Sequence, residues 1–441
     1  DLFARGKKAP LYKVIVEEKK LAPSASGYNM SSEIAGTFSI SVRAFPKTGL
    51  TQVEEAIGEA FARFETDRFT EKDLNRIKIR VRTAFFNQIS SVLYKAFTLA
   101  QYNEYAGSPD YIAEYVERLL AVTSDDVWRV YNKYLKDKPY VLTSFVPKGQ
   151  LDLVAKESER FPVKEESAQD QTEVQTTQAA PADVDVSDIP SSFDRSVMPA
   201  SGPTPGVTLP DIWTGKTAND IRVLGIAHHE LPLVQFRIRI QGGMLLDEAG
   251  KEGQAALMAS LMNEGTRNKT PIELQEAIDD LGASIGISAG AEATSLSGRC
   301  LVSELDQVVD LVREILLEPR WDNKEFDRLK QRTLESIRRS KDNPTYVADI
   351  VFDKLVYGHE YKLAGRVQGT TASVNALTVD DLKRYYARNM SSSVADIAIA
   401  GDLSQAQALK VFARLEAWEG QPVDLPKLPQ PKKPAQTQLY F

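Results

Sequence analysis

The fold is decided by residues 232–266, PLVQFRIRIQGGMLLDEAGKEGQAALMASLMNEGT. In its first part, Val234, Phe236, Ile238 and Ile240 alternate with polar residues, the period of a strand with one buried face. A glycine pair then breaks the strand, and residues 253–263 form an apolar run of helical length. The segment therefore predicts a sheet with a helix packed on it.

The same alternation of patterns continues on both sides of this segment and outlines a folded unit over residues 211–421. We predict strands at 220–227, 232–240 and 395–402 and two strands within 283–303. Helices are predicted at 253–263, 271–281, 305–317, 323–339, 346–356 and 404–417. Strands early and late with helices between them indicate an α+β sandwich, a mostly antiparallel sheet with helices mainly on one face.

A second unit of the same α+β class is predicted over residues 1–150. Its pattern indicates a helix at 11–21, strands at 21–28, 37–44 and 139–147, and helices at 52–64, 71–105 and 110–135. Thr70, followed by first-turn carboxylates, is a predicted N-cap.

Residues 151–210 differ in composition and are predicted to be a linker. The run VKEESAQDQTEVQTTQAAPADVDVSD at 163–188 is acidic and has no aromatic residue, and a Pro-rich stretch follows it. Such a stretch buries too little apolar area to offset its ordering entropy. After residue 421 a Pro-rich turn and a strand-like run predict that 422–441 begin a further, truncated domain.

Overall composition excludes several classes of protein. The formal net charge of −7 argues against electrostatic capture of nucleic acid or an anionic membrane. No apolar run reaches the ~20 residues of a membrane span. Cys300 is the only cysteine, which excludes an internal disulfide and a cysteine-based zinc site. The basic residues of helix 71–105 alternate with apolar ones and indicate a solvated helix face.

Several segments carry a family resemblance. The second unit contains, in order, HHELPLVQFRIRIQGG (228–243), ALMASLMNEGT (256–266), ILLEPRW (315–321), VQGTTASVNALTVDDLKRYY (367–386) and IAIAGDL (397–403). This succession resembles the amino-terminal domain of an insulinase/pitrilysin-family zinc metallopeptidase. The first unit, with LYKVIVEEKKLAPSASGY at 11–28, resembles the companion, non-zinc domain of that family. The order of these two domains implies that the chain is an internal fragment of a bacterial family member built from two repeats.

The family holds zinc with H-x-x-E-H on a helix, because two His four residues apart share a face and the Glu activates water. When the motif is aligned on Gly265 and Thr266, which follow it, its three functional positions fall on Ala256, Ala259 and Ser260. Two methyl groups and a hydroxyl provide no zinc ligand set, so we expect no catalytic, cofactor or metal-binding residue in this chain. The family's third ligand would fall near Glu335 or Ser336.

The three histidines of the chain do not indicate a metal site either. His228 and His229 are adjacent at a strand end and should point to opposite faces, which disfavours a shared metal. His359 is expected to pack a loop.

The resemblance implies part of a zinc metalloendopeptidase that hydrolyses peptides in a clam-shell chamber. This chain would form non-catalytic walls and be inactive alone, with zinc in a missing catalytic domain. A periplasmic location is the expectation for such a bacterial protein. The alternative is a non-catalytic partner or scaffold subunit that completes a chamber with an active subunit. A free-standing peptide-binding module is a third possibility, and in every case the partner is a peptide or a protein.

We predict that limited proteolysis cuts first within residues 169–188 and leaves two resistant fragments, because unpacked acidic chain is readily accessible to proteases. Mass spectrometry of the early fragments locates the cuts. Early cutting inside residues 74–105 instead would contradict the predicted division of the chain.

Overall fold

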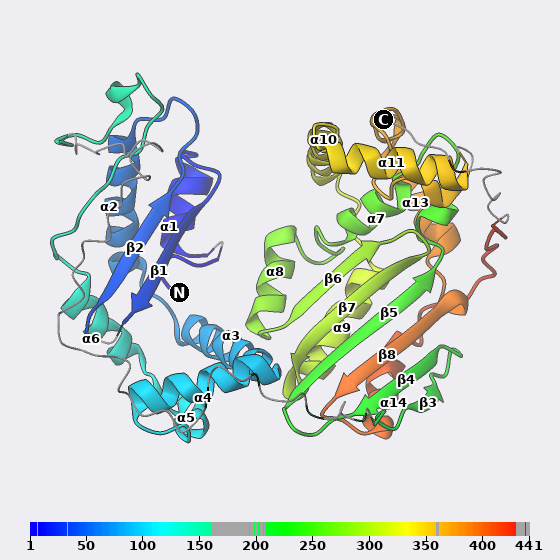
Figure 1. Cartoon of the computed structure of the whole chain (residues 1–441), viewed down its shortest axis with the longest axis horizontal. Helices are drawn as coiled ribbons and strands as arrows, with labels where there is room; N and C mark the ends of the chain where they lie inside the picture. The colour runs from blue at the N-terminus through cyan, green and yellow to red at the C-terminus, as the bar shows by residue number, and fades with distance from the viewer. Residues whose placement is uncertain are drawn as a thin grey trace.

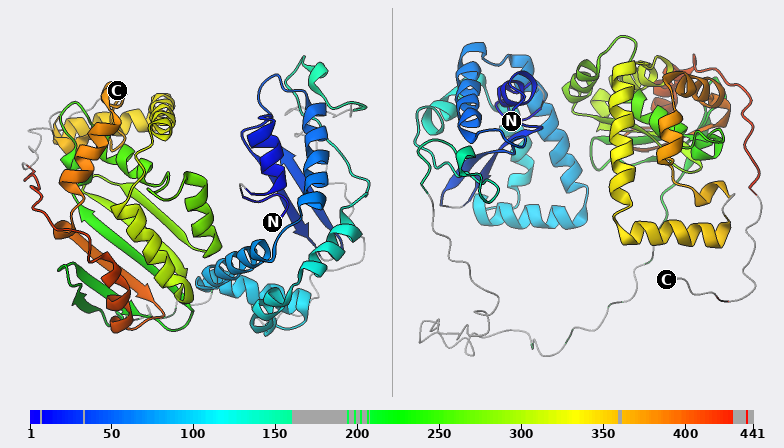
Figure 2. Two further views of the ribbon diagram at one scale, coloured as in Figure 1. Left: turned by 180° about the vertical axis from the view of Figure 1, so that it is seen from behind. Right: turned by 90° about the horizontal axis from the view of Figure 1, so that it is seen from above.

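The computed structural model describes residues 1–6, 8–32, 34–159, 194, 198, 202, 206, 208–358, 361–428 and 437. Two separate hydrophobic cores lie in these residues, one in the amino-terminal unit (described residues up to 159) and one in the carboxy-terminal unit (208–428). Figures 1 and 2 show the two units side by side. Most of the predicted linker and of residues 422–441 lies outside the described residues.

The carboxy-terminal unit is built on a six-stranded sheet with the strand order β3-β4-β8-β5-β7-β6. Its strands are β3 (Trp213–Lys216), β4 (Arg222–Ala227), β5 (Leu233–Gln241), β6 (Ser284–Ala289), β7 (Ala293–Leu301) and β8 (Ala395–Gly401). β4 and β8 run parallel, and every other neighbouring pair is antiparallel. The predicted α+β class is confirmed for this unit, and β3 is a strand that the sequence pattern did not reveal.

Strand β5 is central because it pairs with both β7 and β8. The alternation predicted for it is confirmed: Val234, Phe236, Ile238 and Ile240 are all buried. The ring of Phe236 lies over Gly298 of β7 and meets the ring of Phe412 edge-on at 5.6 Å. This face of the sheet therefore forms the larger core.

The helices of this unit follow the predicted segments closely. They are α7 (Gln254–Met262), α8 (Pro271–Asp280), α9 (Leu305–Leu317), α10 (Asn323–Ser340), α11 (Pro344–Tyr357), α12 (Thr371–Ala376), α13 (Val379–Asn389) and α14 (Gln405–Phe412). Helices α12 and α13 were not predicted. Each begins at a threonine, Thr370 or Thr378, whose hydroxyl accepts from the backbone three residues on, a capping box that a scan for apolar period overlooks.

The amino-terminal unit pairs a short sheet with a set of helices. Its elements are α1 (Pro10–Tyr12), the π-helix η1 (Lys13–Glu18), the antiparallel strands β1 (Ala25–Ser31) and β2 (Gly36–Val42), and the helices α2 (Leu50–Asp67), α3 (Glu71–Ile89), α4 (Val92–Ala106), α5 (Tyr111–Ala121) and α6 (Ser124–Tyr134). The predicted cap at Thr70 is confirmed as a capping box with Asp73.

Two expectations for this unit were wrong. Residues 139–147 form no strand: Val141 is 92% and Phe145 99% exposed, so their apolar pattern has no partner surface in the described chain. The helices predicted at 71–105 and 110–135 are each two helices. The first breaks at Ser90 and Ser91, and the second breaks where Thr123 caps α6.

Aromatic side chains from distant parts of the chain form the centre of the amino-terminal core. The ring of Phe3 stacks on Phe61 at 4.2 Å and meets Phe64 edge-on at 5.8 Å. Phe64 in turn packs against Trp128 and Tyr131 of α6. These contacts join the start of the chain, α2 and α6 in one cluster.

We predict that Gly298→Ala destabilises the protein by about 1–3 kcal/mol, because a Cβ there would lie 2.2 Å from Cζ of Phe236 and force the ring out of its place. Urea denaturation measures the change. The matched control is Gly286→Ala on β6, where an added Cβ meets nothing within 4 Å. Equal stability of the two variants would contradict the packing described for β5 and β7.

Candidate functional site

Helix α7 is the element on which the predicted zinc positions lie. Seven of its nine residues are buried, and it packs against α13, α10 and strand β6. Figure 1 shows it on the helical side of the sheet, with α10 and α11 beyond it. An apolar helix enclosed in this way is typical of a core element.

The amino end of α7 is capped by a side chain from outside the helix. Its N-cap residue is Gly253, at a φ of 96°, and provides no side chain. Instead, Asp247 accepts hydrogen bonds from the backbone of Gly253 and of Ala255, each at 2.8 Å. Burial raises the pKa of this carboxyl to about 6, although the two backbone bonds and Lys362 act against the rise. Sequence reasoning missed Asp247. The only sign of it in the sequence was Gly253, a glycine at the position where a residue with a capping side chain usually stands.

The three vacated positions lie together on one stretch of α7, as the i, i+3, i+4 spacing requires. Ala259 is fully buried, while Ala256 and Ser260 are partly buried. The Ser260 hydroxyl donates to the Ala256 carbonyl at 2.9 Å. This hydroxyl is therefore satisfied within its own helix and is not directed at a ligand.

Helix α10 packs against α7, but the predicted third-ligand positions bring no carboxylate to it. Glu335 lies on the exposed side of α10, with its side chain 60% accessible and an ion pair of 3.8 Å to Arg338. The carbonyl of Ser336 accepts from the Ser340 hydroxyl. Within the residues that the structure describes, no three His, Cys, Asp or Glu side chains are grouped to hold a metal ion.

The remaining candidate groups lie apart from α7. His229 Nδ1 is 2.7 Å from Asp402 Oδ1, whereas His228 approaches Glu230 at 3.9 Å, so the two exposed rings engage different carboxylates. His359 lies outside the described residues. Cys300 is buried, and burial raises the pKa of its thiol to about 12, which keeps the thiol protonated and makes it a poor nucleophile.

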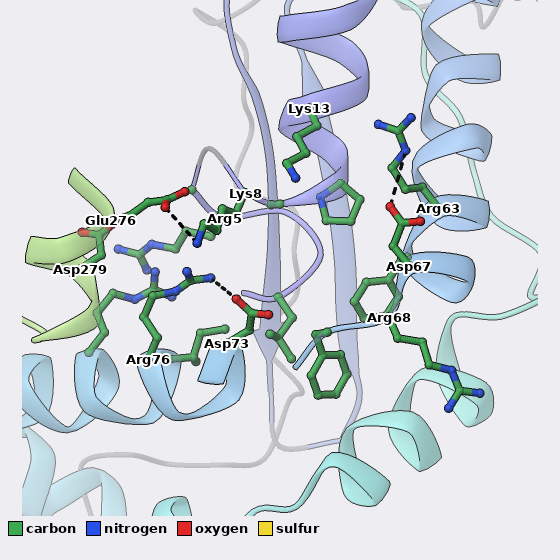
Figure 3. Close-up of a pocket in the computed structure, with 18 of the residues that line it drawn as sticks. Arg5, Lys8, Lys13, Arg63, Asp67, Arg68, Asp73, Arg76, Glu276 and Asp279 are labelled. Carbon is green, nitrogen blue, oxygen red and sulfur yellow. Dashed lines mark ion pairs between the residues drawn. The ribbon is translucent and has the colours of Figure 1, made fainter. Parts of the chain in front are cut away.

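A cavity of about 370 Å³ lies where the two units meet. Figure 3 shows Lys8 directed at Glu276 of α8, and Arg76 at Asp73. These ion pairs measure 2.9 and 3.1 Å. The described lining has cations from the amino-terminal unit and carboxylates from both units, but no His or Cys. We interpret this cavity as an ion-paired seam between the units, not as a reaction site.

The predicted basic helix face also belongs to this seam. Arg80 of α3 pairs with Asp1 at 2.8 Å, and Lys72 pairs with Asp280 of α8 at 2.9 Å. Gly282, after α8, lies so close to α3 that an added Cβ would be 2.7 Å from Ile79 Cγ2. The charges of Lys72 and Arg80 are therefore engaged within the protein. No helix among the described residues is long and apolar enough to cross a membrane.

Comparison with known protein families gives two matches. The family described as Insulinase (Peptidase family M16) matches residues 222–362, and the Peptidase M16 inactive domain matches residues 1–81. The chain is 22% identical over 183 residues to the non-peptidase homolog YmxG of Helicobacter pylori, a match that covers 42% of each protein. It is 25% identical over 190 residues to an uncharacterized zinc protease of Streptomyces coelicolor, covering 42% of this chain and 41% of the relative.

Among solved structures, a peptidase M16 inactive domain from Pseudomonas fluorescens aligns with a TM-score of 0.48 and 26% identity. It covers 51% of this chain and 54% of that one. The chain thus spans less than half the length of the two relatives named above.

We predict that Asp247 makes stability fall as the pH rises from about 4 to about 6. The folded carboxyl binds its proton more tightly than the unfolded one, so the stabilising contribution is complete below pH 4 and is lost as the pH passes the folded pKa. The total change is about 3 kcal/mol at most. Urea denaturation of the wild type and of Asp247→Asn across this pH range measures it. A difference between the two that does not vary with pH would contradict the raised pKa.

Proposed function

Because the chain belongs to the insulinase family of peptidases (peptidase family M16), we propose that it forms non-catalytic walls of a clam-shell peptidase chamber. Zinc and the catalytic carboxylate would be supplied by another domain of the same polypeptide. The chain would contribute enclosure and shape, and peptides would be the substrates of the assembled enzyme. A periplasmic location is part of this proposal.

The observation that carries the proposal is the packing of α7. We take α7 as the counterpart of the family's zinc helix, with Ala256, Ala259 and Ser260 at its ligand positions. Ala259 has no exposed surface, so a water molecule could not reach a base placed there without repacking of the core. The chemistry was therefore replaced by core packing, while the fold was retained.

The division of the chain in this proposal follows the sequence interpretation. Residues 1–150 are the companion domain of a first repeat, 151–210 the linker, 211–421 the degenerate zinc-peptidase-like domain of a second repeat, and 422–441 the start of the next domain. The two hydrophobic cores support this division, because each unit buries its own apolar side chains.

A second candidate function is a non-catalytic partner or scaffold subunit. The relative named a non-peptidase homolog favours it, since that name describes a protein of this family without peptidase activity. In this case the active site would lie on a different polypeptide, and the chain would complete a chamber formed with it.

The test is peptidase activity of the entire polypeptide that contains this chain, measured on a quenched fluorescent peptide with and without a zinc chelator. We expect cleavage that the chelator abolishes and added zinc restores. The isolated 441-residue chain is the control and should be inactive. Activity of the entire polypeptide that is indifferent to chelation would refute the zinc mechanism. No activity without an added subunit would favour the partner role.

A further inference from the structure

Strand β6 forms one edge of the six-stranded sheet. It pairs with β7 on one side, and no strand of the described chain pairs with its other side. An edge strand presents backbone N–H and C=O groups that can pair with an extended chain, which is how proteins bind peptides by strand addition and also how they aggregate. The free side of β6 is thus the place where an extended peptide would be expected to add.

The central position of this free side is already occupied. Asn263, the C-cap residue of α7, accepts a hydrogen bond from the Ile287 N–H through Oδ1 at 3.0 Å. Its Nδ2 donates to the Ile287 carbonyl at 2.8 Å and to the Ala259 carbonyl at 3.0 Å. One side-chain amide therefore satisfies both backbone groups of Ile287 and is itself held to the end of α7.

The register of the sheet identifies which backbone groups face the free side. Ile287 lies opposite Leu296 of β7, and its groups turn toward Asn263, away from β7. Along an antiparallel strand, the backbone N–H and C=O groups of successive residues point alternately toward the paired strand and away from it. The backbone groups of Ile285 and Ala289 therefore also point to the free side. No side chain of the described residues bonds the outward groups of these two. Ile287 is the middle of the three outward positions.

The amide of Asn263 offers the same donor and acceptor as a peptide group. We propose that Asn263 acts as an intramolecular plug: it makes the two hydrogen bonds that a residue of an added strand would make, and so prevents β6 from accepting an extended peptide or the β6 edge of a second copy. An added strand cannot form hydrogen bonds with the backbone of both Ile285 and Ala289 while the Asn263 side chain occupies the position between them. Asn263 is exposed, so an incoming peptide meets this plug before it meets the strand.

This inference concerns the edge alone and does not depend on the proposed function. If the proposed function also holds, this unit would lack metal ligands and would in addition have a closed strand edge. In an assembled chamber, extended peptides would then add to a different strand edge. The same plug would also protect an isolated sheet from edge-to-edge association.

The first test is amide hydrogen exchange of the full 441-residue chain, measured by NMR on deuterated protein. The Ile287 amide should exchange at least tenfold more slowly than those of Ile285 and Ala289, although all three face the free side. Equal exchange at the three amides would overturn the proposal. This measurement requires no variant and is unaffected by any loss of folding.

The second test adds Asn263→Ala, with Asn268→Ala as a matched control. Asn268 is exposed as well, and its side-chain amide interacts with the carboxylates of Glu318 and Glu314, not with β6. The probe is a labelled peptide of eight alternating Val and Thr residues with a Lys at each end. Asn263→Ala should bind it roughly ten- to a hundredfold more tightly than the wild type, the factor that two ordinary hydrogen bonds carry. Binding should protect the amides of Ile285, Ile287 and Ala289.

Sedimentation provides a third readout. Dimerisation of Asn263→Ala that is absent from the wild type and from Asn268→Ala would support the proposal, because a second β6 edge is an equivalent partner. Equal peptide affinity of the wild type and Asn263→Ala, together with protection of the β6 amides in both, would overturn it. Asn263→Asp keeps the acceptor but not the donor and should give an intermediate affinity.

Discussion

The structure of the carboxy-terminal unit depends on the burial of α7 between the sheet and helices α10 and α13. This helix has an apolar surface nearly all round, so it is stable only where other elements cover it. Its amino end is anchored by Asp247 and its carboxyl end by Asn263, each through hydrogen bonds to backbone groups. A side chain therefore bonds terminal backbone groups at each end of the helix, two N–H groups at the amino end and the Ala259 carbonyl at the carboxyl end.

The same packing bears on the proposal that this unit holds no zinc. A zinc site needs side chains that project into space accessible to water and substrate. Here Ala259 contributes to a dry core, and Ser260 bonds within its own helix. Methyl side chains have no desolvation cost, so α7 packs at Ala256 and Ala259 without an uncompensated charge.

The amino-terminal unit shows a different balance of forces. Its core is an aromatic cluster that joins Phe3 to α2 and α6. Its contact with the other unit combines exposed or half-buried ion pairs with the packing of α3 against Gly282. Such pairs contribute little each, because water screens them and the side chains lose freedom. These ion pairs therefore add little to the stability that each unit gains from its own core.

Much of this could be predicted from local patterns in the sequence. The alternation in β5 and the cap at Thr70 are properties of residues close together in the chain, and residue type is enough to recognise them. The assignment of zinc-motif positions to Ala256, Ala259 and Ser260 comes from the family resemblance and stays a prediction. Three other features depended on the tertiary structure. They are the lack of a partner strand for residues 139–147, the capping of α7 by Asp247, and the contact of Asn263 with Ile287. The last of these pairs residues 24 positions apart. Sequence patterns report the period of a single element, whereas these contacts depend on where separate elements come to lie, and only the path of the whole chain decides that.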